Sequence, residues 1–353
     1  MHERLRRASD PSGFLPFDRF VEVALYAPGV GYYSALERLG PSGDFYTAAH
    51  VHPVFAETVA DRIRAEYERL GRPREFRVVE AGPGDGQLAA GILGTLPATL
   101  DPATQLEYVL VEGSSTLRKT LSERLSEGPA AETVRFSSSV GADGPFEGVL
   151  LANELLDALP FRRLIGRSGA WRELGVRLDG DRVEWSEGPV ASVPAPSIPP
   201  PPEEGTILEL GTTAEAFVRE VGDHLEAGAA LFFDYGAEES ELLLGHPRGT
   251  LAAVRSHRPV EDPLDAPGTS DLSTFVNFTR IRAAAQTSGL RELAYGSQAE
   301  ALGRWGIEAR IAAAISSAGS AEAEVRVRLA TKNLLFGFSN FRVLELAAVG
   351  APR

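Results

Sequence analysis

The sequence predicts an α/β protein built on an open, largely parallel β-sheet with helices on both faces. Three observations lead to this fold class. Residues 76–93 pass from a β-rich segment through three glycines at spacing two into a segment of helical composition. Residues 107–112 form a second β-rich run that ends on an acidic residue. Residues 148–152 are a continuous apolar run, as expected for a strand that is buried on both faces.

The chain before the glycine turn, residues 1–75, is predicted to be an N-terminal helical region with one loop. Apolar positions over 14–25 recur at near-helical spacing, and a second helix is expected over 54–70. Between these helices, residues 42–47 are polar and contain glycine. This loop either folds over the glycine turn as a lid or is an ordinary connector.

Residues 76–160 are predicted to form the ligand-binding core of the sheet. Three polar residues, Asn153, Glu154 and Asp157, follow the apolar strand directly. They therefore lie at the carboxyl end of a strand, which is where open α/β sheets bind their ligands. If residues 154–159 are helical, Glu154 and Asp157 share one face; otherwise they cap a helix or pair with an arginine.

Residues 161–205 are predicted to be an insertion that lies outside the parallel sheet. Two alternating runs, 169–178 and 182–185, are joined through an Asp-Gly turn, which indicates an antiparallel hairpin. Residues 189–202 are rich in proline, which favours an extended linker.

Residues 206–353 are predicted to complete the core and to supply loops around the site. The apolar strand 229–233 ends on another acidic residue, Asp234, and the polar segment 256–272 is expected to be a loop near the site. The remaining expected elements are strands at 134–137, 206–210 and 249–255, helices at 212–225 and 278–288, and a final antiparallel pair of 333–338 with 341–346.

The composition excludes several classes of protein. The formal charge of −14 argues against nucleic acid as a partner, because phosphate binding needs a clustered positive surface. Cysteine is absent, which excludes disulfides, thiolate metal sites and cysteine nucleophiles. No apolar run approaches the roughly eighteen residues of a membrane span, and the N-terminus lacks the apolar segment of a signal peptide. We therefore expect a cytoplasmic protein without a membrane partner.

Metal binding is not expected either. His50 and His52 could lie on one face of a strand in the manner of metal ligands. A third ligand is not evident in the sequence, and metal sites in proteins need at least three.

The residues around the glycine turn indicate which ligand it binds. From Gly84 the sequence matches the G-x-G-x-x-A dinucleotide pattern, which alone is weakly specific. Asp85 and Glu80 flank the turn, and two carboxylates would repel a pyrophosphate but suit a ligand with cationic groups. S-adenosylmethionine has an ammonium and a sulfonium group and no phosphate. The acid that ends the next strand, Glu112, is expected to accept hydrogen bonds from ribose hydroxyls.

Seven motifs in order make the chain resemble the MidA-like methyltransferases over almost its whole length. The most diagnostic is Asn-Glu-x-x-Asp-Ala-Leu-Pro at 153–160. The others are Leu-Tyr-Ala-Pro at 25–28 with Gly-Tyr-Tyr at 31–33, Gly-Asp-Phe at 43–45 with Thr47, Glu-Ala-Gly-Pro-Gly-Asp-Gly at 80–86, Val-Glu at 111–112, Asp-Tyr-Gly at 234–236, and Gly-Thr-Leu at 249–251 before His-Arg-Pro at 257–259. The chain departs from the family at 48–50, where Ala-Ala-His replaces the usual Ser-Pro-Glu, and at Asn277, where an aspartate is usual.

The resemblance implies a Rossmann-like class I methyltransferase sheet with S-adenosyl-L-methionine as the cofactor. The family includes the mitochondrial complex I assembly factor that methylates a protein arginine, so a protein with an accessible arginine is the expected partner. The residues expected to bind the cofactor are Gly43, Asp44, Phe45, Thr47, Glu80, Gly82, Pro83, Gly84, Gly86, Glu112 and Asn153.

Four residues are the candidates for catalysis by in-line methyl transfer, which depends mainly on alignment and electrostatics. Glu154 and Asp157 are the hypothesised pair that holds the guanidinium by charge-assisted hydrogen bonds. Asp234 is a third candidate carboxylate, and His257 is a candidate base.

Other functions remain compatible with the sequence. The altered residues 48–50 are compatible with a methyltransferase that acts on a small-molecule acceptor. A non-catalytic assembly or scaffold protein could retain the same fold. A dehydrogenase is the least favoured alternative, because Asp85 and Glu80 flank the turn. The sequence does not indicate an oligomeric state.

Overall fold

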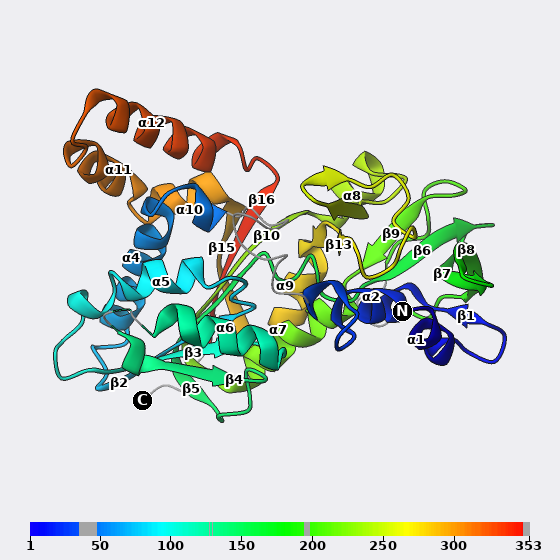
Figure 1. Ribbon diagram of the computed structural model, residues 1–353, viewed down its shortest axis with the longest axis horizontal. Helices are drawn as coiled ribbons and strands as arrows, with labels where there is room; N and C mark the ends of the chain where they lie inside the picture. The colour runs from blue at the N-terminus through cyan, green and yellow to red at the C-terminus, as the bar shows by residue number, and fades with distance from the viewer. Residues whose placement is uncertain (35–47, 127, 129, 194–197, 349–353) are drawn as a thin grey trace.

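An eight-stranded sheet forms the centre of the computed structural model, in which residues 1–34, 48–126, 128, 130–193 and 198–348 are described (Figure 1). The strand order is β15-β16-β10-β5-β2-β3-β4, and β14 pairs with β10. The bounds are β2 (Glu75–Ala81), β3 (Gln105–Val111), β4 (Val134–Ser137), β5 (Phe146–Asn153), β10 (Leu225–Ala237), β14 (Val276–Asn277), β15 (Leu290–Ser297) and β16 (Phe341–Ala348). Neighbours from β10 to β4 run parallel, whereas β16 is antiparallel to β10 and β15. The predicted sheet is confirmed.

Helices cover both faces of this sheet. Val149 and Leu151 of β5 pack into one hydrophobic cluster, and Leu150 and Ala152 pack into another on the opposite side. The strand is thus buried on both faces, as its apolar run predicts. The first cluster includes residues of α4 (Val54–Arg69), α5 (Gln87–Leu93) and α10 (Gln298–Arg304), and the second those of α7 (Thr212–His224) and α9 (Phe278–Thr287). The helices expected after the glycine turn and at 54–70, 212–225 and 278–288 are confirmed, whereas α10 was not predicted.

An antiparallel sheet lies beside the central one, with the order β1-β7-β6-β9 and β8 paired to β7. Its strands are β1 (Phe14–Leu15), β6 (Arg162–Arg167), β7 (Ala170–Asp179), β8 (Arg182–Val190) and β9 (Ile207–Leu210). The predicted antiparallel insertion is confirmed, but it recruits two flanking segments. The strand expected at 206–210 pairs with β6 instead of joining the central sheet. Residues 14–15, expected to be helical, form β1 beside β7, and α2 (Phe17–Tyr26) begins after them.

A small sheet of order β12-β11-β13 completes this side of the molecule. Its strands are β11 (Ala252–Arg255), β12 (Arg258–Pro259) and β13 (Asp271–Ser273). The strand expected at 249–255 is therefore confirmed for its second half, outside the central sheet. Phe17 and Phe20 of α2 pack in one cluster with Phe161 and Leu272. Helix α2, the insertion and the small sheet thus share a core.

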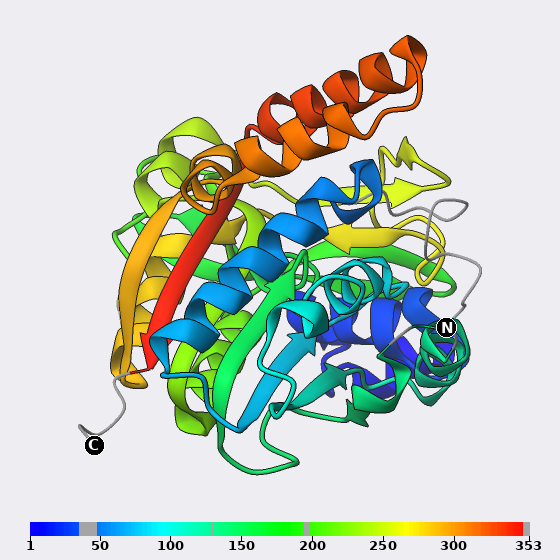
Figure 2. The ribbon, with the colours of Figure 1, turned by 90° about the vertical axis from the view of Figure 1, so that its left-hand side faces the viewer.

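Two helices near the C-terminal end, α11 (Ile307–Ser316) and α12 (Ala321–Phe336), form a hairpin that projects from the body of the molecule (Figure 2). The strand expected at 333–338 is wrong, because α12 continues through Phe336 and buries Leu334 against the core as a helical residue. Its expected partner, 341–346, lies in β16 and pairs with β10 and β15 instead.

The remaining elements lie at the surface or between strands. They are α1 (His2–Ala8), η1 (Tyr32–Ser34), α3 (Ala48–Val51), η3 (Pro97–Thr99), α6 (Ser115–Leu125), η4 (Ala131–Thr133) and α8 (Glu239–Gly245). Among the helices of the described ranges, none has both the length and the apolar character required to cross a membrane.

Candidate active site

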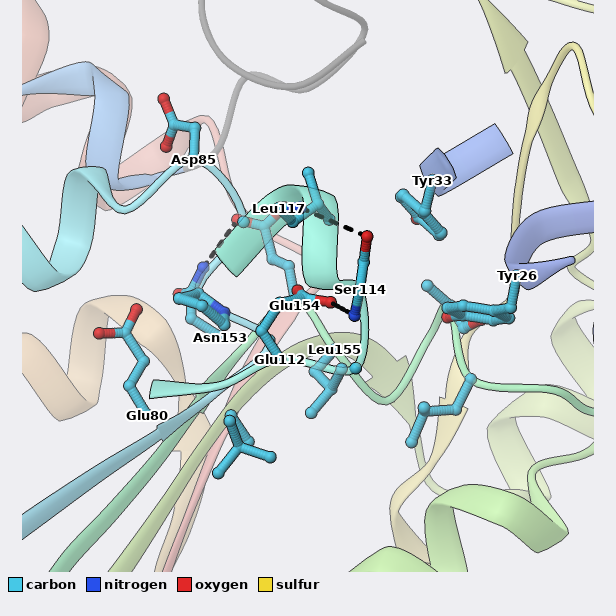
Figure 3. Close-up of a pocket in the computed structure, with 18 of the residues that line it drawn as sticks. Tyr26, Tyr33, Glu80, Asp85, Glu112, Ser114, Leu117, Asn153, Glu154 and Leu155 are labelled. Carbon is cyan, nitrogen blue, oxygen red and sulfur yellow. Dashed lines mark hydrogen bonds between the residues drawn. The ribbon is translucent and has the colours of Figure 1, made fainter. Parts of the chain in front are cut away.

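A cavity of about 700 Å³ opens at the carboxyl ends of β2, β3 and β5 (Figure 3). Its lining comes from the glycine turn after β2, the residues after β3, the end of β5 and the N-terminal segment. The lining residues used below are Tyr26, Tyr33, His50, Glu80, Gly82, Pro83, Gly84, Asp85, Glu112, Asn153, Glu154 and Leu155. This edge of a parallel sheet is the place where α/β proteins bind ligands, so the cavity lies where the sequence predicted the site.

The glycine turn adopts a backbone that requires glycine. Gly82, Gly84 and Gly86 have φ angles of +65°, +55° and +80°, a region that side chains with a Cβ rarely adopt. A Cβ at Gly84 would meet no atom of the described residues within 4 Å, so these residues leave the main chain at Gly84 uncovered. A ligand in the cavity can therefore approach the main chain closely.

Asp85 does not present a free charge to this cavity. Its carboxylate accepts hydrogen bonds from the Arg124 guanidinium (2.8 Å) and from the ring of His50 (3.1 Å). Burial alone would raise the pKa of Asp85, but these partners together lower it to about 2. Asp85 is thus ionised and already paired, and the expected repulsion of a pyrophosphate by its carboxylate is wrong.

Glu80 is the second carboxylate expected to flank the turn, and it is 2% exposed. The hydroxyl of Tyr108 donates a hydrogen bond of 2.6 Å to it. Burial nevertheless raises the pKa of Glu80 to about 7. At neutral pH it is therefore only partly ionised, so the electrostatic argument made from the sequence overstates the negative charge at the turn.

Glu112 follows β3 and lines the cavity, as predicted. One of its carboxylate oxygens accepts the backbone N–H of Ser114 at 2.7 Å, which fixes the side chain near the start of α6 (Figure 3). Burial raises its pKa. A carboxylate held at this strand end is suited to accept hydrogen bonds from ribose hydroxyls.

Asn153 ends β5 and Glu154 follows it directly, and both line the cavity. The Asn153 amide donates to a Glu154 carboxylate oxygen at 3.3 Å (Figure 3). The amide oxygen of Asn153 is buried and has no hydrogen-bond partner in the described part of the chain. A buried acceptor without a donor is costly in a folded protein, so a ligand that supplies an N–H or O–H here would be favoured.

Residues 154–159 form a turn and not a helix, so the condition under which Glu154 and Asp157 would share one helical face is not met. Glu154 has φ +53° and borders the cavity, whereas Asp157 is buried behind it. Asp234 is 1% exposed and accepts the backbone N–H groups of Leu156 (2.8 Å) and Asp157 (3.3 Å). Asp234 therefore holds the turn that presents Glu154.

These three carboxylates share the protein interior, and the described part of the chain gives them no ion-pair partner. Burial first, and then the neighbouring Asp157, raise the pKa of Glu154 to about 8. Burial also raises the pKa of Asp234 to about 8 and that of Asp157 well above its usual range. In the described ranges no lysine or arginine forms an ion pair with any of the three. Within the described ranges, the alternative that these carboxylates pair with an arginine is therefore not observed.

Sequence reasoning missed three residues that surround this cluster. The Tyr33 hydroxyl donates to Asp271 of β13 at 2.8 Å, and the Tyr26 hydroxyl donates to the backbone oxygen of Ala158 at 2.9 Å. Both tyrosines line the cavity. The two tyrosines belong to the motifs at 25–28 and 31–33, which marked these segments in the sequence but did not indicate what the tyrosine side chains do.

Other predicted residues lie elsewhere. His257 is exposed in the turn between β11 and β12, with φ +59°, and does not line the cavity. Gly43, Asp44, Phe45 and Thr47 lie outside the described residues, as does the whole candidate lid loop, residues 42–47.

The two histidines considered as metal ligands are used differently. His50 contacts Asp85, and His52 accepts the backbone N–H of Val54 at 3.2 Å. A search of the described residues finds no group of three His, Asp or Glu side chains that could hold a metal ion.

The donor set fits S-adenosyl-L-methionine. The cavity volume lies within the roughly 300–1,000 Å³ of small-molecule sites. Gly82 and Gly84 allow a ligand to approach the main chain closely. The Glu112 carboxylate can accept hydrogen bonds from ribose hydroxyls, and the amide oxygen of Asn153 can accept one from an N–H group of the ligand. When bound, this cofactor supplies a methyl group on a positively charged sulfur.

Known proteins of similar sequence support this assignment. A family model described as that of S-adenosyl-L-methionine-dependent methyltransferases matches residues 58–296. The protein arginine methyltransferase NDUFAF7 homolog, mitochondrial, of Drosophila melanogaster is 29% identical over 317 residues, which are 81% of this chain and 70% of that protein. Protein arginine methyltransferase NDUFAF7, mitochondrial, of Rattus norvegicus is 28% identical, over 87% of this chain and 74% of the relative.

A solved structure supports both the fold and the cofactor. A crystal structure described as that of a methyl transferase from Burkholderia thailandensis, bound to S-adenosyl-homocysteine, is 33% identical with a TM-score of 0.85. The match covers 95% of this chain and 88% of that one. The fold is that of a class I methyltransferase, and S-adenosyl-L-methionine is the methyl donor. The chain belongs to the S-adenosyl-L-methionine-dependent methyltransferase family that the matching model describes.

Proposed function

We propose that this methyltransferase transfers a methyl group to a guanidinium nitrogen of an arginine in a protein substrate, of the respiratory complex I subunit type. The similar proteins from Drosophila melanogaster and Rattus norvegicus are named protein arginine methyltransferases. The cytoplasmic location expected from the sequence is part of the proposal and can be tested by cell fractionation.

The observation that carries the proposal is the interior cluster of Glu154, Asp157 and Asp234 beside the cofactor cavity. A buried carboxylate without a counter-ion is unfavourable, and a site that keeps three of them is suited to a cationic ligand. Guanidinium is planar, always charged and able to bind a carboxylate through two parallel hydrogen bonds. Glu154 is the member of the cluster that borders the cavity, so we assign it the contact with the guanidinium.

Asp234, Glu154 and Asp157 have different roles in the proposed reaction. Asp234 fixes the 154–158 turn through its two backbone hydrogen bonds, so that Glu154 is held at the cavity. The nitrogen that gains the methyl group must lose a proton. An ionised Glu154 carboxylate with a pKa of about 8 is a suitable acceptor near neutral pH. Asp157 acts through Glu154, because its charge raises the pKa of that carboxyl.

The direct test replaces Glu154 with Gln. The variant should bind S-adenosylhomocysteine with unchanged affinity in titration calorimetry and lose turnover by about a hundredfold or more, the scale of a lost general base. Turnover is read as transfer of labelled methyl groups to protein, followed by mass spectrometry of methylated arginine. Glu184→Gln, on the exposed strand β8, is the matched control and should retain full activity.

The same experiment distinguishes the alternatives. Residues 48–50 give a specific reason to consider a small acceptor, because the backbone N–H of Ala48 bonds to Glu154 and His50 contacts Asp85 at the cavity. Label that appears in the small-molecule fraction and not in protein would replace arginine methylation with that function. Failure of the wild-type chain to bind S-adenosylhomocysteine would favour the non-catalytic assembly protein.

A further inference from the structure

Helix α12 has an apolar face on each side, and only one of them is covered. Thr331 and Leu334 are buried against the rest of the molecule. On the opposite side, Val325, Leu329 and Phe336 are 53%, 62% and 72% exposed. The hairpin that carries this face projects from the body of the molecule (Figure 2). Three large exposed side chains on one helix face form a surface that another helix could cover.

The exposed face has the spacing of a coiled-coil seam. Glu322, Val325, Leu329, Lys332 and Phe336 follow one another at intervals of three, four, three and four residues. Side chains at this spacing form one continuous stripe and are the a and d positions through which two helices pack side by side. We call these five residues the α12 seam.

We infer that the α12 seam pairs antiparallel with the same seam of a second copy of this chain. Antiparallel helices pack a positions against d positions of the partner helix. With a two-fold axis at residue 327, Val325 meets Leu329 of the partner subunit, and Glu322 meets Lys332 of the partner subunit. Each contact then occurs twice, as a symmetric dimer interface requires.

The charges of the seam select this arrangement. An antiparallel pair places an acidic side chain against a basic one at both ends of the seam. A parallel pair would place Glu322 against Glu322 and Lys332 against Lys332, which costs energy. In the described part of the chain, neither residue has an ion pair of its own. Arg328 beside the seam is paired with Glu324 of the same helix, which reduces repulsion between the copies.

The hairpin is also where two copies can approach at low electrostatic cost. The chain carries a formal charge of −14, so most surfaces of two copies repel each other. Helix α12 departs from this balance, because Arg326, Arg328 and Lys332 offset Glu322 and Glu324. A helix of 16 residues extends about 24 Å. The surface area that a single helix pair of this length buries is at or below the lower end of the range for stable interfaces. We therefore expect a dimer of micromolar affinity.

Sedimentation velocity of the full chain over a range of concentrations tests the dimer. The wild-type chain should pass from monomer to dimer in the micromolar range. Leu329→Glu should weaken dimerisation by at least about tenfold, because it places a charge in the apolar layer of the interface. Leu244→Glu is the matched control, because Leu244 is 77% exposed on α8 at a distance from the hairpin (Figure 1). It should leave the dimer unchanged.

A charge exchange tests the register. Glu322→Lys and Lys332→Glu should each weaken the dimer by about tenfold, because each creates two like-charge contacts in a symmetric pair. The double variant restores opposite charges and should recover most of the wild-type affinity. Because these residues are exposed in the monomer, thermal unfolding and S-adenosylhomocysteine binding should be unchanged in all variants.

Several results would overturn the inference. One is a chain that stays monomeric up to about 100 μM, well above the affinity expected here. Another is a dimer that survives Leu329→Glu, and a third is a double variant as weak as either single variant. A monomeric chain that loses methylation of its protein substrate in Leu329→Glu would assign the seam to substrate docking instead.

Discussion

Glu112 is the single residue on which the cofactor site can be tested most directly. Its replacement by Ala should weaken binding of S-adenosylhomocysteine by roughly tenfold to a hundredfold, the scale of hydrogen bonds lost from a charged acceptor. Titration calorimetry measures this. Glu107→Ala, at an outer position of the same strand, is the control and should bind normally. Unchanged affinity in Glu112→Ala would remove Glu112 from the ribose contact.

Glu154 should set the pH dependence of turnover. Its carboxyl has a pKa of about 8, mainly because it is buried, and must be ionised to hold a guanidinium. We expect kcat/KM to rise from about pH 6, to reach half of its plateau near pH 8 and to level off about one pH unit above that, since this ratio reports ionisations of the free enzyme. Asp157→Asn removes a neighbouring carboxyl whose ionisation opposes that of Glu154, and should shift the rise to lower pH. A profile that is the same in both proteins would contradict the assigned role of Asp157.

For single residues, the sequence predicts which side chains lie at the site better than it predicts their hydrogen-bond partners and ionisation. Glu112, Asn153 and Glu154 lie at the cavity, because an acid or amide directly after an apolar strand has little freedom to be elsewhere. The state of Asp85 was not predictable, since its partner Arg124 comes from α6 and is selected only by tertiary packing. The pairing of Tyr33 with a residue of the small sheet was hidden for the same reason.

The glycine turn gives a prediction for an element. Gly84→Ala should fold with a loss of about 1 kcal/mol, the cost of a Cβ in this backbone region, because no atom of the described residues lies within 4 Å of the new methyl group. The added methyl group should also weaken S-adenosylhomocysteine binding, because it keeps the ligand further from the main chain. Gly82→Ala should instead lose more stability, since its Cβ would lie 2.8 Å from Leu155 Cδ1. Chemical denaturation and calorimetry on both variants separate these effects.

Helices and strands with a clear hydrophobic period could be predicted from the sequence. Elements whose place depends on pairing with a segment far away in the chain could not. The sheet core from β2 to β5 follows from apolar strands separated by helices. Strand β9 has the same local character, but pairing with β6 places it in the antiparallel sheet. The apolar run at 333–336 suggested a strand, although the preceding residues 321–332 favour helix and extend it to Phe336.

The acidic cluster should affect the stability of the whole molecule. In the folded chain, Glu154 and Asp234 have pKa values of about 8, well above their ordinary values of 4.5 and 3.8. Carboxyls that bind protons more tightly when folded stabilise the protein below their unfolded pKa, and this contribution is lost as the pH rises through 8. Asp85 has a pKa of about 2, so its ionised carboxylate stabilises the folded protein above about pH 4, and this contribution is lost as the pH falls below that value.

We therefore expect the free energy of unfolding of the ligand-free protein to decrease between pH 5 and 8.5 by on the order of 1 kcal/mol or more. Urea denaturation at a series of pH values measures this. Glu154→Gln should make the curve flatter, because the amide does not titrate. A stability that increases over this range would mean that the cluster is not buried as described.

The shared core of α2, the insertion and the small sheet has a consequence for biosynthesis. Phe17 and Phe20 leave the ribosome early, yet Phe161 and Leu272, with which they pack, are made much later. Until then the aromatic side chains of the nascent N-terminal segment have no surface to cover them. The first part of the chain to be translated is thus among the last to reach its final place, and it closes the catalytic cavity only when translation is well advanced.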